Sequence, residues 1–136
     1  MRDLWVEGDA NVLLRFLTGE PPELAERALR LIQKAEQGEV SLKLSPIVVA
    51  EIVWVLSSFY RYSRTQIAEV LLPLIVSDGM ICDEIQQVTA ALNLMASANV
   101  DFLDAYLAEI ARHTGESVVS FDRDFRRLGI NWIEPE

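Results

Sequence analysis

The sequence is poor in several residue types on which common protein classes depend. Cys82 is the only cysteine, so an internal disulfide is impossible and a cytoplasmic location is expected. His113 is the only histidine, which excludes zinc sites built on histidine pairs. It falls in the last turn of a predicted helix, a position that does not favour activation of a serine nucleophile. No apolar run is long enough to cross a bilayer, and the N-terminus lacks the long apolar segment of a secretory signal.

Positive charge is also scarce. Lys34 and Lys43 are the only lysines, and the formal net charge of the chain is −9. This balance argues against a protein that holds nucleic acid by a broad basic surface. It permits an enzyme that engages nucleic acid through a bound divalent metal, and it favours a basic protein partner.

The residues that are present indicate one α/β domain over residues 1–136, because 51% of the chain is hydrophobic and its length is that of an ordinary domain. Alternation of apolar and polar residues predicts a strand at residues 40–44, and short mainly apolar runs predict strands at residues 4–6, 80–82, 117–120 and 131–133. Helical periodicity and caps predict helices at residues 11–17, 23–37, 46–59, 84–97 and 101–113, and another from Ser63 with Pro73 as a kink or stop. This alternation predicts a central parallel sheet of about four to five short strands, flanked by helices on both faces.

Four carboxylates stand where this architecture would gather them. Each lies at or near the start of a predicted helix, and right-handed crossovers place helix starts at the carboxyl edge of the sheet. The four are Asp9, Glu51, Asp104 and Asp122. Because like charges repel, such a cluster stays ionised only around a cation, and hard oxygen ligands select Mg²⁺ or Mn²⁺. The pattern therefore predicts a divalent metal site, which most often serves phosphate chemistry.

Each aspartate of this set also has a simpler explanation as a cap that complements a helix dipole. Asp101 and Asp104 form a D-x-x-D pair. In such a pair one side chain caps the helix, and the other accepts a hydrogen bond from the backbone amide of the capping residue. Glu51 resists this explanation, because residues 47–56 are otherwise apolar. A helix that is apolar all round is expected to be buried, so Glu51 needs either a metal or a structural ion pair. Trp54 is expected in the core beside it.

Three further aromatic residues follow the helix that carries Glu51. Phe59, Tyr60 and Tyr62 are either core residues or an exposed patch, and a cluster at a helix end favours contact with a partner. Cys82 is expected to be a small core residue.

Four segments around the acids resemble motifs of the PIN domains, and within them the VapC-type toxins of toxin–antitoxin pairs. D-A-N-V-L at residues 9–13 resembles the opening D-T-N motif, and V-A-E-I-V-W-V-L at residues 49–56 resembles the glutamate-bearing helix. D-F-L-D-A at residues 101–105 resembles D-F-x-D-A, and S-F-D-R-D-F at residues 120–125 resembles T-F-D-x-D-F. The four occur in the family's order along nearly the whole chain, which makes the set specific.

The resemblance implies the PIN-like fold and a role for each matching residue. The catalytic and metal-binding acids would be Asp9, Glu51, Asp104 and Asp122, with Mg²⁺ or Mn²⁺ as the cofactor. Asp101 and Asp124 would be auxiliary acids, and Asp124 is alternatively a turn-former. Ala10 stands where threonine or serine is usual. The missing hydroxyl is expected to weaken a contact that supports the metal-binding residues. Ser120 replaces the commoner threonine and keeps a hydroxyl.

The family likeness implies a Mg²⁺-dependent endoribonuclease, the toxin of a VapBC-type pair, which cleaves RNA with a metal-activated water. Its implied partners are a VapB-like antitoxin and a second copy in a homodimer, with no membrane. Ser120, Arg15 and Arg123 are candidates for contact with the RNA backbone. Solvated surface arginine is the simpler explanation for the last two.

Three alternatives stay open. Aspartyl-phosphate hydrolases are also α/β and use Mg²⁺, but they need D-x-D where this chain has D-A-N at residues 9–11. A response-regulator receiver domain needs a lysine after a late strand, whereas Lys34 and Lys43 come early. The third is a non-catalytic PIN-like protein that binds only a basic partner peptide.

Overall fold

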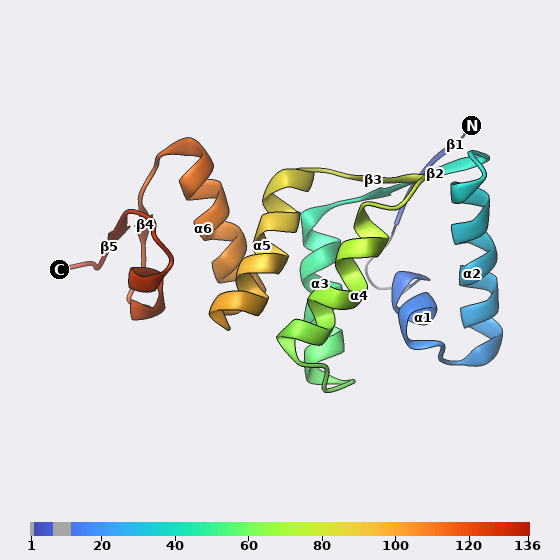
Figure 1. Cartoon of the computed structure of the whole chain (residues 1–136), viewed down its shortest axis with the longest axis horizontal. Coiled ribbons are helices and arrows are strands. Elements are labelled where there is room, and N and C mark those ends of the chain that lie inside the picture. Colours follow the sequence, from blue (N-terminus) through green and yellow to red (C-terminus); the bar gives the residue numbers. More distant parts are fainter. Residues whose placement is uncertain (1, 7–11) are drawn as a thin grey trace. The chain divides into compact units, whose positions relative to one another are not determined.

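The protein is described by a computed structural model that covers residues 2–6 and 12–136. The chain forms two compact units, Met1–Ile85 and Gln86–Glu136. In chain order the first unit contains β1 (Arg2–Trp5), α1 (Val12–Thr18), α2 (Pro22–Glu36), β2 (Val40–Leu44), α3 (Pro46–Ser58), α4 (Arg64–Ile75) and β3 (Met80–Cys82) (Figure 1). The helix α5 (Ile85–Ala98) begins at the boundary, and the second unit continues with α6 (Phe102–Thr114), β4 (Val118–Val119), the 3₁₀ helix η1 (Arg123–Arg127) and β5 (Trp132–Ile133).

The first unit is built on a parallel sheet in the order β1-β2-β3. Leu42 in the central strand pairs with Leu4 on one side and with Met80 on the other. The central strand β2 is mostly buried, whereas β1 at the edge is mostly exposed. All three strands run the same way, so their carboxyl ends share one edge of this sheet.

The helices of the first unit begin where local chemistry predicts. Ser45 caps α3 with its hydroxyl, which accepts a hydrogen bond from the Val48 amide at 3.3 Å, and Pro46 takes the first helical position. Ser63 and Gln66 form the predicted capping box at the start of α4, where each side chain accepts from the other residue's amide. Pro73 lies inside α4, which ends at Ile75.

The second unit pairs β4 with β5 in parallel, Val118 opposite Trp132. Asp101 caps α6 and Gly115 ends it in the left-handed conformation with φ of +77°. Figure 1 shows β4 running back beside α6, with which it is in contact. The α/β class and all five predicted strands are confirmed, and among the described residues the strands pair as a sheet of three and a sheet of two.

One prediction about packing is wrong. The helix α3 is not buried all round, because Ile47 is 81% exposed and Trp54 is 63% exposed. Only the stripe that contains Val49, Ile52 and Leu56 is buried. An apolar composition on every face does not say which face the rest of the protein covers, so Trp54 lies outside the core. None of the helices in residues 2–6 and 12–136 is both long and apolar enough to cross a membrane.

Candidate active site

The carboxyl edge of the first sheet is where the sequence places two of the four acids. The strand β1 ends there at Trp5, and Asp9 follows it in a segment that lies outside the described residues. The strand β2 ends there at Leu44, and α3 starts directly afterwards. Glu51 therefore stands in the second turn of a helix that begins at this edge.

Glu51 is exposed rather than buried, which corrects the sequence-based expectation. It shares a face of α3 with the exposed Ile47 and Trp54, at spacings of four and three residues. Within the part of the chain that the structure describes, no cation forms an ion pair with Glu51. Its carboxylate is thus open to solvent, and residues 2–6 and 12–136 do not supply the structural ion pair that was the competing explanation.

Asp104 lies in the first turn of α6, where its side chain is half-buried. Asp101 is the cap of this helix, since its carboxylate accepts a hydrogen bond from the Phe102 amide at 3.1 Å. Of the two aspartates in the D-x-x-D pair, Asp101 is therefore the one that caps the helix. Asp104 does not serve as the cap, although an acid in the first turn still suits the helix dipole.

Asp122 follows β4 and organises the turn into η1. Its carboxylate oxygen Oδ1 accepts a hydrogen bond from the Asp124 amide at 2.9 Å. Its own amide donates to the Ser120 hydroxyl, also at 2.9 Å. The carboxylate is exposed and pairs with no cation among the described residues. Asp122 therefore combines a fixed backbone with a side-chain oxygen left for a ligand.

The second unit brings the positions of two acids to one of its ends. Because β4 runs back beside α6, the turn η1 follows at the end where α6 begins (Figure 1). Asp104 stands in that first helical turn, and Asp122 stands directly before η1. Two of the predicted ligands thus come from the same end of the unit.

The complete set of four acids is not assembled within either unit. Asp104 and Asp122 belong to the second unit, Glu51 to the first, and Asp9 lies outside the described residues. Accordingly, the described residues contain no group of three or more acidic, histidine or cysteine side chains able to hold a metal ion. That the four acids share one pocket stays a prediction.

The residues proposed to contact substrate have defined surroundings. Ser120 accepts from Asp122 through its hydroxyl oxygen, which leaves the hydroxyl proton to donate elsewhere. Arg123 forms an exposed ion pair with Glu134 at 3.5 Å. Arg15 donates to the Glu20 carbonyl at 3.4 Å, and its Nε is buried without a hydrogen-bond partner in the described part of the chain. Their contact with RNA stays a prediction.

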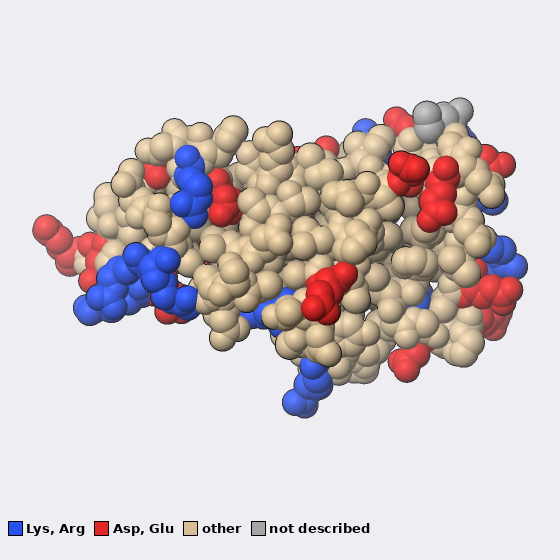
Figure 2. Space-filling model, in the orientation of Figure 1, with Lys and Arg blue, Asp and Glu red and all other residues tan. Residues whose placement is uncertain are grey.

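Basic side chains concentrate on η1, although the chain as a whole is acidic. An open pocket there is lined by Arg123, Asp124, Arg126 and Arg127. Figure 2 shows blue side chains gathered over this part of the second unit. The Asp124 carboxylate pairs with Arg127 at 3.7 Å, and its backbone amide donates to Asp122, while its role as an auxiliary acid or a turn-former stays a prediction. The cluster places guanidinium groups within five residues of Asp122.

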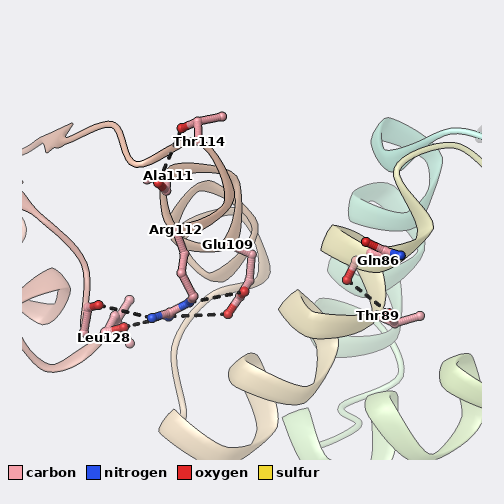
Figure 3. A network of polar contacts seen from close by, with 8 residues as sticks. Gln86, Thr89, Glu109, Ala111, Arg112, Thr114 and Leu128 are labelled. Carbon is pink, nitrogen blue, oxygen red and sulfur yellow. Dashed lines mark hydrogen bonds and ion pairs between the residues drawn. The ribbon is translucent and has the colours of Figure 1, made fainter.

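Sequence patterns missed the residues that hold the Asp122 segment in place. Trp132 donates its indole N–H to the Ser120 carbonyl at 3.0 Å. Arg112 reaches from α6 to the carbonyls of Leu128 and Gly129, as Figure 3 shows for Leu128. Arg112 was one of several basic residues near a helix end, and backbone carbonyl partners 16 and 17 residues away leave no motif in a sequence.

Cys82 and the aromatic residues behave as their types suggest. Burial, and secondarily the charge of Asp83, raises the pKa of the Cys82 thiol to about 11, so it is a neutral core group. Phe59 is exposed and meets Tyr60 edge to face, with ring centroids 5.1 Å apart. Tyr60 meets Tyr62 in the same way at 6.5 Å. Their contact with a partner stays a prediction.

Comparison with known proteins matches both units. The family model described as "PIN domain" matches residues 8–131, a range that contains all four acids. A protein named "VapC ribonuclease" from Aquifex aeolicus (strain VF5) is 31% identical over 129 residues, which cover 93% of this chain and 94% of that protein.

Proposed function

The chain belongs to the PIN domain family, and from this premise we propose that it is a metal-dependent endoribonuclease, the toxin of a VapBC-type toxin–antitoxin pair. One observation carries the proposal most directly. Glu51 and Asp122, which come from different units, are both exposed carboxylates with no ion-pair partner among the described residues. Exposed, unpaired acids at the carboxyl ends of strands suit ligand binding better than fold stability.

The donors match a hard divalent cation. All four proposed ligands are carboxylates, and Ser120 adds a hydroxyl, so the proposed set contains neither His113 nor Cys82. Oxygen donors without nitrogen or sulfur favour Mg²⁺ or Mn²⁺ over zinc. When bound, such an ion supplies Lewis-acid activation of the attacking water and neutralises charge on the phosphodiester.

Each residue then has a stated part in the proposal. The metal-holding acids are Asp9, Glu51, Asp104 and Asp122. The Asp122 carboxylate keeps its position because Oδ1 is bonded to the Asp124 amide, which leaves Oδ2 for the ion. Ser120 donates its free hydroxyl proton to a phosphate oxygen, and Arg123 offers a guanidinium to the RNA backbone. Residues 1–136 act as one domain in this proposal, because both units supply ligands.

The proposed partners follow from the relative and from charge. A VapB-like antitoxin with a basic segment would be attracted to a chain of net charge −9. A homodimer would cover exposed apolar side chains such as Phe59 and Trp54. We place the protein in the cytoplasm, where its RNA substrate is found.

The test is an RNA cleavage assay on protein purified free of antitoxin. Cleavage of a structured RNA is expected in Mg²⁺ or Mn²⁺, and it should disappear in EDTA and in Asp9→Asn. Cleavage that continues unchanged in EDTA or in the variant would refute the metal mechanism.

The same assay separates the alternatives. No RNA cleavage together with hydrolysis of a small phosphate monoester would favour a Mg²⁺-dependent phosphate hydrolase. No metal uptake together with tight binding of a basic peptide would favour a non-catalytic partner-binding protein.

A further inference from the structure

The connection between β4 and β5 carries Asp122 and is held at both of its ends. At its start, the Ser120 amide donates to the Ile133 carbonyl at 3.0 Å, and Trp132 donates to the Ser120 carbonyl. These bonds fix the chain just before Asp122. Towards its other end, Arg112 of α6 donates to two backbone carbonyls, Arg127 of η1 donates to the Ala98 carbonyl, and Phe125 and Leu128 are buried.

Arg112 binds two consecutive carbonyls with one guanidinium group. Nη2 donates to the Leu128 carbonyl at 2.8 Å, and Nη1 donates to the Gly129 carbonyl at 3.1 Å. Glu109, one turn back on α6, holds the guanidinium from the other side at 3.4 Å from Nε (Figure 3). A planar group with fixed donor directions specifies both the position and the orientation of the backbone that it binds.

The backbone that Arg112 binds includes a glycine in a left-handed conformation. Gly129 has φ of +70°, a left-handed conformation that favours glycine. A Cβ atom at this position would lie 3.4 Å from Arg112 Nη1, which is ordinary van der Waals contact, so a substitution there would act through strain in the backbone that Arg112 binds. Arg112 is 43% exposed, so a shorter side chain there opens the site to water and leaves no buried cavity.

The contact links the two acids of the second unit mechanically. Arg112 and Asp104 lie on the same helix, and eight residues of helix separate them by about 12 Å. The charge of Arg112 is screened over such a distance, since the Debye length is about 8 Å at physiological salt. Its influence on a metal site at the start of α6 therefore passes through the position of the bound loop.

We propose that Arg112 is a positioning residue, which fixes the Asp122-bearing connection against the helix that carries Asp104 and so sets the spacing of these two acids for a divalent cation. This inference rests on the proposed metal-dependent function. It assigns a role to a residue that touches neither the metal nor the RNA.

The test compares Arg112→Gln and Arg112→Lys with the wild-type protein by calorimetric titration of Mn²⁺. Both variants should weaken Mn²⁺ binding by about 10-fold, the lower end of the effect of groups that orient metal ligands. The lysine variant keeps the positive charge but loses the pair of hydrogen bonds to the two carbonyls. Its Mn²⁺ affinity should therefore be close to that of the glutamine variant. In cleavage assays kcat should fall at fixed Mg²⁺ while KM for RNA stays within about 2-fold, since RNA contacts are retained.

Two controls separate positioning from general loss of stability. Arg30→Gln removes an arginine that pairs with Glu26 on the exposed face of α2, and it should leave Mn²⁺ affinity unchanged. Hydrogen exchange without metal should be faster at residues 122–129 in both Arg112 variants, but unchanged within α6. Gly129→Ala should reproduce the metal defect, and the double variant with Arg112→Gln should be no worse than either single variant.

The possible outcomes distinguish the two proposals. Mn²⁺ binding that is lost in Asp122→Asn but normal in Arg112→Gln would overturn the positioning role and leave the proposed function standing. A lysine variant with wild-type affinity would also overturn it, because charge alone would then suffice. A wild-type protein that takes up no Mn²⁺ would overturn both proposals.

Discussion

At the scale of single residues, Glu51 is the most informative side chain. Its helix buries one stripe, yet the face that bears Glu51 stays exposed together with Ile47 and Trp54. An exposed carboxylate without an ion pair adds little to stability. A role in ligand binding would instead make it essential for activity.

Substituting Glu51 should therefore separate activity from stability. Glu51→Gln is expected to change the free energy of unfolding by no more than about 0.5 kcal/mol, as for other surface substitutions. RNA cleavage should fall by roughly 100-fold or more, because a lost ligand removes several kcal/mol of transition-state stabilisation. Urea unfolding and initial cleavage rates measure the two effects.

The matched control is Glu69→Gln, which removes an exposed glutamate from α4 in the same unit. It should leave both quantities unchanged. A Glu51→Gln protein that unfolds easily, or that cleaves RNA at the normal rate, would contradict the assignment of Glu51.

Cys82 gives a prediction of the opposite kind, an unreactive group. Because its pKa is raised from 9.0 to about 11, the native thiol stays neutral near pH 8. Iodoacetamide should alkylate it slowly in the folded protein and quickly in denaturant.

The raised pKa also means that the neutral Cys82 thiol contributes stability that is fully present below pH 9 and is lost as the pH rises towards about 11. Cys82→Ala should remove that part of the alkaline loss, and equal alkylation rates in folded and unfolded protein would show that the thiol is accessible.

At the scale of helices and strands, local chemistry predicts much of this fold. The cap at Ser45 with Pro46, the capping box at Ser63 and the terminal Gly115 all act over a few neighbouring residues, so the sequence reveals them directly. The exposed face of α3 was not predictable in this way. Burial depends on which elements pack against a helix, and an apolar sequence such as residues 47–56 is compatible with either arrangement.

Gly79 marks a contact between elements that no motif reveals. Its φ is +83°, and a Cβ there would lie 2.3 Å from the carbonyl oxygen of Ala35 at the end of α2. Its own carbonyl accepts from the Leu42 amide at 2.8 Å, so the strand cannot move away without losing a sheet bond. Gly79→Ala should lower the free energy of unfolding by about 3 kcal/mol, through backbone strain and overpacking together.

Gly38 provides the control for this prediction. Its φ of +82° is nearly the same, but no atom lies within 4 Å of the position of an added Cβ. Gly38→Ala should cost only about 1 kcal/mol, from backbone strain alone. Urea unfolding measures the loss of stability in each variant. Equal losses in the two variants would mean that the protein relieves the close contact with Ala35 without a cost in free energy, which would contradict the prediction.

At the scale of the whole molecule, the order of the acids was predictable and their assembly was not. Parallel strands and helix starts follow from periodicity, so the sequence correctly places Glu51 in the helix after β2 and Asp122 directly after β4. The division of the strands into sheets of three and two depends on pairing between distant segments. The hydrogen bonds from Arg112 to the carbonyls of Leu128 and Gly129 also join residues that are far apart in the sequence.

The central claim is that acids from both units bind one divalent ion. Calorimetric titration of Mn²⁺ into the wild-type protein and four single variants tests it most directly. The variants are Asp9→Asn, Glu51→Gln, Asp104→Asn and Asp122→Asn. We predict that each variant weakens Mn²⁺ binding by at least about 10-fold, whichever unit carries the substitution. Normal affinity in Glu51→Gln alongside a loss in Asp122→Asn would contradict a shared site.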